Sequence, residues 1–337
     1  MVGLQNSILV LESSKNYMVH ETLKGTDPQR IAFDPLNPDR AYCGTFGNGL
    51  WKTDDGGQTW ANIGKDAISN PYLMSVAVNS LNPNSGNKFN KVYAGTEPSA
   101  LYISKYGGDS WEKMDALNKL PSSKSWSFPP RPWTHHVRWI EPDANNSEYV
   151  FAAIEAGALV QSHDGGRTWI DRVEQGPYDT HTLFTHSKAP KRLYSSAGDG
   201  YFESFDYGES WTRPMEGLNH SYLYGLAVDS GNPQIVIVSA SVGPSEAYSP
   251  ENAKSFVYRK EEDCGKWRAV SNGLPEPGGT TITIFASNPK VSGEFYAVNN
   301  RGLFISTDSG NSWRKLDTPW PRKYHSQTPW SLAVSEK

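Results

Sequence analysis

A phrase of eight residues returns along this chain and ends each time in tryptophan. It reads T-D-D-G-G-Q-T-W at 53–60, S-H-D-G-G-R-T-W at 162–169 and S-T-D-S-G-N-S-W at 306–313. Further copies lie at 104–111 and 204–211, and a degenerate copy, K-E-E-D-C-G-K-W, lies at 260–267. Successive tryptophans are 42 to 58 residues apart. A repeat of this period predicts supersecondary units that stack on one another, because one unit alone cannot bury its apolar face.

The phrase has the composition of a tight turn between two strands. A short apolar run precedes it, and the closing Thr/Ser-Trp is expected to start the return strand. An aspartate carboxylate can accept hydrogen bonds from the amides of its own turn, and glycine adopts positive φ easily. We therefore expect four aspartates to hold turns and to take no part in chemistry: Asp55, Asp164, Asp206 and Asp308.

A second pair of strand-like runs lies between successive copies of the phrase. Residues 31–34 are followed by 40–45, residues 75–78 by 91–96, and equivalent pairs recur in the later units. The runs are short, alternating or apolar, and bounded by Gly, Pro and Asn, as is typical of strands. Each unit therefore contains four strands, and four-stranded sheets repeated radially form a β-propeller.

Six complete units span about residues 27–315, and matching segments remain at both ends. Residues 330–334 match the first strand of a unit, residues 7–12 and 17–23 match the last two, and 12–17 looks like an eroded copy of the phrase. A blade built from both termini would close the ring and leave only short, protected sheet edges. The sequence thus predicts one all-β domain over residues 1–337, a propeller of seven four-stranded blades, with six blades as the alternative.

Composition argues against several classes of protein. The net charge is −4 and no Lys/Arg cluster occurs, so a nucleic-acid-binding face is not expected. The mean hydropathy of −0.60 and the lack of an apolar run near 18 residues predict no membrane span. The first twenty residues lack the features of a signal peptide. Two cysteines, Cys43 and Cys264, are too few for a disulfide framework, and we expect free thiols and a cytoplasmic location.

The phrase S-x-D-x-G-x-T-W resembles the Asp-box, or BNR repeat, and its six copies cover most of the chain. The resemblance implies an Asp-box propeller, a superfamily that includes sialidases, xyloglucanases, sortilin-type receptors and photosystem II stability and assembly factors. By size the chain is most similar to single-domain bacterial BNR-repeat proteins described as glycosyl-hydrolase-like. One fold hosts many activities, so the resemblance is specific for fold rather than for function.

The sequence departs in several ways from the named members of this superfamily. The Arg-Ile-Pro motif and an identifiable arginine triad are missing from the sequence, which disfavours a sialidase. Xyloglucanases of this type use two propellers, whereas this chain has room for one. The photosystem factors are exported to the lumen, and the chain shows no export signal.

Ligand sites in such propellers usually lie in the funnel opposite the Asp-box turns, where loops converge. The loops after the second strands of three consecutive units carry an acid, and these acids are Glu97, Glu155 and Asp199. The starts of the first strands supply His136 and His181. His135 and His136 point to opposite sides of their strand, and we favour His136 for the funnel. The sequence therefore predicts a cluster of carboxylates and histidines at one side of the channel mouth.

Three kinds of chemistry fit this cluster. Two carboxylates could act as acid and base, or acid and nucleophile, in glycoside hydrolysis. His136, Glu155 and His181 could hold a divalent metal ion with an open position for water. A histidine could instead be the general base of a hydrolysis or elimination. The competing interpretation is that these acids are ordinary solvated side chains at a wet channel mouth.

Two long loops, 113–131 and 242–255, belong to the same face of the predicted ring. Loops of this length in a compact domain are usually functional or disordered. The aromatic, Pro-rich first loop could cover the funnel and stack on a sugar ring, or it could pack over a blade edge. Six further residues are candidates for ligand contacts: Arg131, Trp133, Tyr178, Tyr222, Asn300 and Arg301.

The leading hypothesis from the sequence is an enzyme, a hydrolase or lyase that acts on a small polar substrate such as a carbohydrate. In this hypothesis Glu155 is the acid/base or a metal ligand, flanked by His136 and His181. Glu97 and Asp199 orient water or substrate. The alternative is a non-catalytic propeller that binds a protein partner during assembly.

Overall fold

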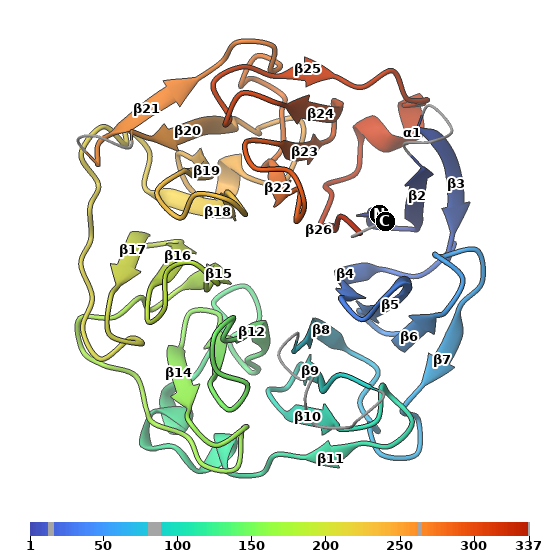
Figure 1. Ribbon diagram of the computed structural model, residues 1–337, viewed down its shortest axis with the longest axis vertical. Helices are drawn as coiled ribbons and strands as arrows, with labels where there is room; N and C mark the ends of the chain where they lie inside the picture. The colour runs from blue at the N-terminus through green and yellow to red at the C-terminus, as the bar shows by residue number, and fades with distance from the viewer. Residues whose placement is uncertain (13–16, 80–88, 262–264, 336–337) are drawn as a thin grey trace.

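The computed structural model describes residues 1–12, 17–79, 89–261 and 265–335, whose strands form seven antiparallel sheets arranged in a ring (Figure 1). In each sheet the first strand lies innermost. Four sheets of this described region have four consecutive strands. They are β4 (Pro28–Asp34), β5 (Asn37–Thr45), β6 (Gly49–Thr53) and β7 (Ala61–Ile63); β8 (Leu73–Val78), β9 (Val92–Thr96), β10 (Leu101–Ser104) and β11 (Glu112–Lys113); β18 (Tyr222–Val228), β19 (Val236–Ser241), β20 (Phe256–Lys260) and β21 (Trp267–Val270); and β22 (Ile284–Ser287), β23 (Phe295–Asn299), β24 (Gly302–Ser306) and β25 (Arg314–Lys315).

Two further sheets keep the same plan with a reduced outer strand. They comprise β12 (Val137–Pro142), β13 (Val150–Ile154) and β14 (Ala158–Ser162), and β15 (Thr180–Phe184), β16 (Leu193–Ala197) and β17 (Gly200–Ser204). A single bridge replaces the fourth strand in each, between Gln161 and Ile170 and between Glu203 and Thr212. Helical turns lie in the connecting loops, namely η2 (Leu117–Lys119), η3 (Pro121–Ser125), η4 (Pro244–Glu246) and α1 (Arg322–His325).

The seventh sheet is built from both ends of the chain. It consists of β26 (Ser331–Leu332), β1 (Val2–Gly3), β2 (Ile8–Glu12) and β3 (Met18–Thr22). The innermost strand β26 pairs with β1, so that Val2 lies opposite Leu332 and Gly3 opposite Ser331. The predicted all-β propeller of seven blades is therefore confirmed, and the six-bladed alternative is wrong. Strand β1 was not expected, because two residues are too few to show an alternating pattern.

Some sequence expectations fall outside the described residues. The eroded copy of the phrase at 12–17 includes residues 13–16, and the degenerate copy at 260–267 includes residues 262–264 with Cys264. The other cysteine, Cys43, is a buried free thiol. Within the described part of the chain, no helix has the length and apolar composition that a membrane crossing requires.

In the repeated phrases the aspartate carboxylates accept hydrogen bonds from residues of their own turns. The Asp164 carboxylate accepts bonds from the Thr168 amide at 2.8 Å, the Thr168 hydroxyl at 2.6 Å and the Ser162 hydroxyl at 2.9 Å. The indole of Trp169 donates to the Gly166 carbonyl at 3.0 Å. Equivalent bonds hold the turns of Asp55, Asp206 and Asp308. These carboxylates have their partners within the turn itself, which suits a structural role.

The hydrophobic core lies between neighbouring blades. Tyr93 and Leu101 of one sheet pack in a single cluster with Ile140, Val150 and Val160 of the next, and all five side chains are buried. Similar clusters fill the other spaces around the ring. Each blade therefore depends on its neighbours to cover its faces, and the inner strands are held at fixed positions around the axis.

Replacement of Asp164 by alanine is expected to destabilise the ring. The variant loses the acceptor for the Thr168 amide and hydroxyl, so urea unfolding should show a decrease of about 1–2 kcal/mol in the free energy of unfolding. Tyr106→Ala, at the same position of the copy without aspartate, should change it by less than about 0.5 kcal/mol. Equal decreases in both variants would contradict the turn role.

Candidate functional site

A cavity with a volume of about 590 Å³ lies at one mouth of the ring. Its lining comes from the starts of inner strands, such as Arg138 of β12, and from the loops after second strands, such as Glu155. The repeated phrases do not contribute to it, since their turns join the third and fourth strands. The pocket therefore occupies the funnel on the face where the sequence predicted a ligand site.

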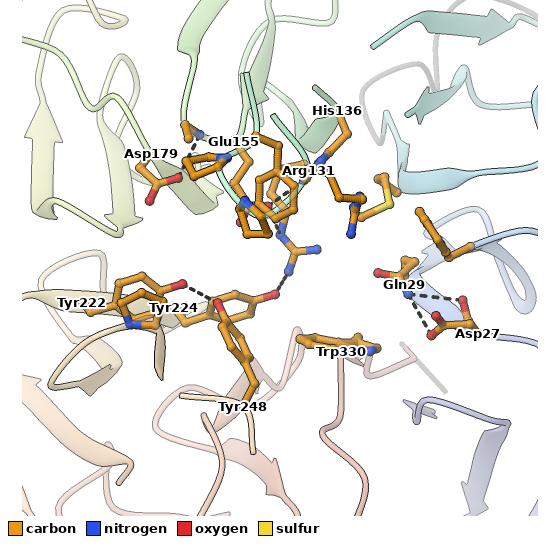
Figure 2. A pocket seen from close by; sticks show the side chains of 18 of the residues that line it. Asp27, Gln29, Arg131, His136, Glu155, Asp179, Tyr222, Tyr224, Tyr248 and Trp330 are labelled. Carbon is orange, nitrogen blue, oxygen red and sulfur yellow. Dashed lines mark hydrogen bonds and ion pairs between the residues drawn. The ribbon is translucent and has the colours of Figure 1, made fainter. Parts of the chain in front are cut away.

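One wall of the pocket is aromatic. Tyr222 and Tyr224 of β18, Tyr248 and Trp330 lie together there (Figure 2). The hydroxyls of Tyr222 and Tyr248 are 2.5 Å apart, and the Tyr224 hydroxyl accepts a hydrogen bond from Arg138. Flat, amphipathic side chains of this kind suit a ligand with apolar faces and polar edges.

Positively and negatively charged side chains alternate at a second wall of the pocket. The Arg131 guanidinium donates to the two oxygens of Glu97 at 2.8 and 2.6 Å. Oε2 of Glu97 also lies 3.2 Å from Nδ1 of His136, and His136 Nε2 lies 2.7 Å from Oε2 of Glu155. Arg138 Nε lies 3.6 Å from the same Glu155 oxygen. The charges thus compensate one another across two blades and a loop.

The pKa values follow from this arrangement. Burial raises the pKa of Glu97, but the hydrogen bonds from His136 and Arg131 outweigh it and bring the pKa to about 2. Burial likewise raises the pKa of Glu155, and the charge and hydrogen bond of His136 with the charges of His181 and Arg138 bring it to about 2. Burial lowers the pKa of His136, but the neighbouring carboxylates raise it above its usual value. The two carboxylates therefore favour the imidazolium form of His136, which lies between them.

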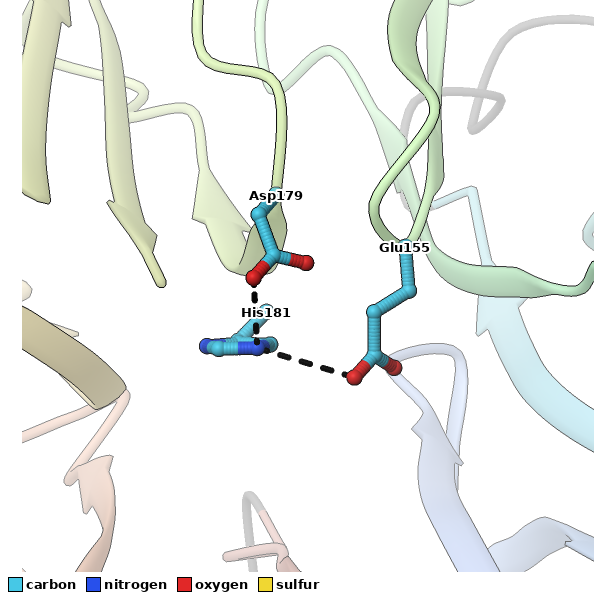
Figure 3. A group of neighbouring side chains, drawn as sticks. All are labelled: Glu155, Asp179 and His181. Atoms are coloured by element: carbon cyan, nitrogen blue, oxygen red, sulfur yellow. Dashed lines mark ion pairs between the residues drawn. The ribbon is translucent and has the colours of Figure 1, made fainter. Parts of the chain in front are cut away.

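Asp179 and His181 extend this group on the other side of Glu155 (Figure 3). His181 Nε2 lies 3.6 Å from Oε1 of Glu155 and 3.7 Å from Oδ2 of Asp179. Glu155 and Asp179 line the pocket, whereas His181 lies behind them and is fully buried. Burial and the charge of Glu155 raise the pKa of Asp179 against the opposing effect of His181.

Asp27 is a carboxyl group of the pocket that the sequence did not reveal. It precedes β4, and Figure 2 shows it with Gln29 on a different side of the pocket from Glu155 and Asp179. Gln29 Nε2 donates to Asp27 Oδ1 at 2.9 Å. Burial raises the pKa of Asp27 to about 6 despite that bond. Asp27 and Asp179 occupy equivalent places before their inner strands, so comparing all seven strand starts would have found it.

The structure brings together most of the predicted cluster. Arg131, His136, Glu155 and Tyr222 line the pocket, and Glu97 and His181 lie directly behind it. His135 packs instead against Trp126, with ring centroids 5.6 Å apart.

Besides Glu97 and His181, five predicted residues lie outside the lining. Asp199 accepts bonds from the amides of Tyr178 and Asp179 at 3.5 and 3.4 Å, so it supports the loop that carries Asp179. Asn300 is buried and bonds to the Thr281 amide and the Gly279 carbonyl. Trp133 is 81% exposed, and Tyr178 and Arg301 also lie away from the pocket lining. These five residues occupy the same positions at strand ends as residues that line the pocket. The conformations of their loops direct them away from the lining.

No protein-family model matches the chain. A stretch of 259 residues is 24% identical to an oligoxyloglucan-reducing end-specific xyloglucanase of Emericella nidulans. It spans 75% of this chain and 28% of that enzyme, so the chain covers little more than a quarter of this relative's length.

Two solved structures show the same propeller fold. An ancestral GH74 enzyme has a TM-score of 0.65 at 18% identity, over 86% of this chain and 38% of that one. YCF48 bound to D1 peptide has a TM-score of 0.56 at 18% identity, over 86% of this chain and 80% of that one. The sequence relation is thus to xyloglucanases, and the structural likenesses show a shared fold.

Glu97→Gln is expected to lower the free energy of unfolding by about 2 kcal/mol at pH 7, because Arg131 and His136 lose the charge that both face. The pKa of Glu97 lies at about 2 in the folded protein, below its usual 4.5, so its contribution is present above pH 4.5 and disappears as the pH falls towards 2. The difference between wild type and variant, measured by urea unfolding, should shrink over this range.

The exposed Glu174 offers a matched control, since Glu174→Gln should leave the pH dependence of unfolding unchanged. A constant difference between wild type and Glu97→Gln from pH 7 to pH 2.5 would contradict the proposed ion pairs.

Proposed function

We propose that this protein is a hydrolase that acts on oligosaccharides of the xyloglucan type, bound in the funnel pocket. The observation that carries the proposal is one pocket that combines an aromatic wall with carboxyl groups on two separate sides. Aromatic faces stack on sugar rings, and carboxyl groups on either side of a glycosidic bond supply the acid and the base of its hydrolysis. The sequence similarity to a xyloglucanase supports this substrate class.

Asp27 has the properties of the general acid in this proposal. Its pKa of about 6, raised by burial, keeps it protonated in mildly acidic solution, and Gln29 holds its orientation. A carboxylic acid in this state can donate a proton to the oxygen of the leaving group. The carboxylates of Glu155 and Asp179 on the other side would then orient the attacking water.

The charged chain behind the pocket would act by positioning. His136 and Arg138 hold one oxygen of Glu155, which leaves Oε1 directed towards His181. Glu97 links His136 to Arg131 on the loop that carries Phe128, Pro129 and Pro130 over the pocket. We infer that this link holds the loop against the bound sugar. The turns of the repeated phrases and the size of the chain agree with the resemblance to glycosyl-hydrolase-like Asp-box propellers.

Asp27→Asn tests the proposal. The variant keeps the shape of the side chain but cannot donate the proton, so kcat for the release of reducing ends from xyloglucan oligosaccharides should fall by about 100-fold or more. In the wild type, kcat/KM should fall as the pH rises above about 6, since Asp27 must be protonated to act. This decline should be absent from the residual activity of the variant.

Asp66→Asn, an exposed aspartate outside the pocket, is the matched control and should retain full activity. Unchanged turnover in Asp27→Asn, with the same pH profile as wild type, would refute Asp27 as the acid. The complete inability of the folded wild type to cleave xyloglucan oligosaccharides would refute the hydrolase itself.

A second candidate function is binding of a protein partner without catalysis. The chain covers 80% of the YCF48 chain, which is bound to D1 peptide in its structure, but only 38% of the ancestral GH74 enzyme. This alternative predicts that a peptide competes for the pocket and that Asp27→Asn leaves peptide binding intact. Turnover of oligosaccharides by the wild type would rule it out as the sole function.

A further inference from the structure

We propose that Glu155, Asp179 and His181 bind one divalent transition-metal ion, with Zn²⁺ as the ion of first choice and water completing the coordination from the pocket. The three side chains come from adjacent blades, since Glu155 follows β13, Asp179 precedes β15 and His181 lies within β15. One ligand atom from each lies within 4.8 Å of the others. Figure 3 shows the three side chains converging on one point.

Each ligand is held by the atom that faces away from this point. His181 Nδ1 lies 2.6 Å from the Leu223 carbonyl oxygen, and Asp179 Oδ1 accepts a bond from the Ala156 amide at 2.9 Å. Glu155 Oε2 lies 2.7 Å from His136 Nε2. The remaining atoms, His181 Nε2, Asp179 Oδ2 and Glu155 Oε1, are the ones that converge. Outer contacts of this kind orient the ligands of metal sites.

The tautomer of His181 is set by its carbonyl partner. A carbonyl oxygen only accepts, so Nδ1 carries a hydrogen, and Nε2 is the ring atom that can bind a metal ion in place of a second proton. His181 is fully buried, and Nε2 has no hydrogen-bond partner among the described residues. A buried polar atom without a hydrogen bond is unfavourable, and a metal ion bound between Nε2 and the two carboxylate oxygens would compensate all three atoms.

The separations agree with a shared ion better than with direct contacts. At 3.6 and 3.7 Å from the carboxylate oxygens, His181 Nε2 is too far away for a hydrogen bond. Ligand bonds of about 2.0–2.2 Å at tetrahedral angles place neighbouring ligand atoms about 3.3–3.6 Å apart. All three ligand atoms lie within 4.8 Å of one another, so the two carboxylate oxygens must move closer together when an ion binds.

The neighbouring backbone leaves room for this arrangement. Gly198 lies beside the site, and a Cβ atom there would fall 2.0 Å from Asp179 Oδ2 and 3.3 Å from a ring carbon of His181. Only a residue without a side chain lets Asp179 take its observed position. A mutation of Gly198 can therefore disturb the proposed ligand without altering any ligand chemically.

The donor set selects the kind of ion. One imidazole nitrogen with two carboxylates suits Zn²⁺ or Mn²⁺, whereas Ca²⁺ and Mg²⁺ prefer oxygen ligands alone. The ligand set differs from the one expected from sequence, because both nitrogens of His136 already lie against carboxylates and Asp179 takes its place. The ion does not depend on the proposed hydrolase, although it would activate the attacking water there.

The experiment is titration of untagged, chelator-treated protein with ZnCl₂ by calorimetry, followed by metal analysis after dialysis. We expect one Zn²⁺ per chain, with binding of Ca²⁺ and Mg²⁺ at least 10-fold weaker. His181→Gln and Asp179→Asn should each weaken Zn²⁺ binding by 10-fold or more. Gly198→Ala should weaken it similarly while all three ligands remain, and circular dichroism confirms that each variant is folded.

Asp27→Asn separates this inference from the proposed hydrolase, since Asp27 lies elsewhere in the pocket and the variant should bind Zn²⁺ as the wild type does. Turnover lost in Asp27→Asn with Zn²⁺ retained supports both ideas. Folded wild type that binds no Zn²⁺, or His181→Gln that binds it with unchanged affinity, overturns the metal site whatever the activity. Equal affinity for Ca²⁺ overturns the choice of ion.

Discussion

Ring closure by β26 and β1 is the constraint on which the rest of this structure depends. Antiparallel pairing of Val2 with Leu332 and of Gly3 with Ser331 joins the two ends of the chain in one blade. The Ile31 amide of the next blade donates to the Ser331 hydroxyl at 2.9 Å, so the closing strand is tied to its neighbour as well. In a closed ring every blade has a neighbour on either side, so both faces of each sheet are covered.

Ring closure also explains why a cluster of buried, charged side chains can be stable at the funnel. Buried charges are costly unless partners stand at defined positions, and here the partners come from different blades. Glu97, His136 and Glu155 alternate in charge because β9, β12 and β13 are held side by side. The same rigidity holds His181 and Asp179 close to Glu155 without direct hydrogen bonds between them. We infer that this compensated charge network keeps the ligand atoms aimed at one point.

The repeats were sufficient to predict the approximate position of the site but not all its members. Residues at equivalent points of successive units must surround the same axis, so the convergence of Glu97, His136, Glu155 and His181 followed from spacing alone. The sequence did not predict Asp27 as a pocket residue, because the start of its inner strand, β4, was left out of the comparison of strand starts. Trp133 and Asn300 occupy similar strand-end positions but turn away from the pocket, because the course of each loop is set by its own contacts.

The sequence by itself determined the class of fold and predicted seven blades and the face of the candidate site, because the period of the repeated phrase and the alternation of its strands are local patterns. Only the tertiary structure decided which side chains line the pocket, which of their atoms face one another and how their pKa values shift. The pKa of Asp27 rises to about 6 and that of Glu155 falls to about 2, although both are ordinary carboxyl groups in the sequence. Burial acts on both, and only Glu155 has cations to oppose it, namely His136 and Arg138 of its own blade and His181 of the next.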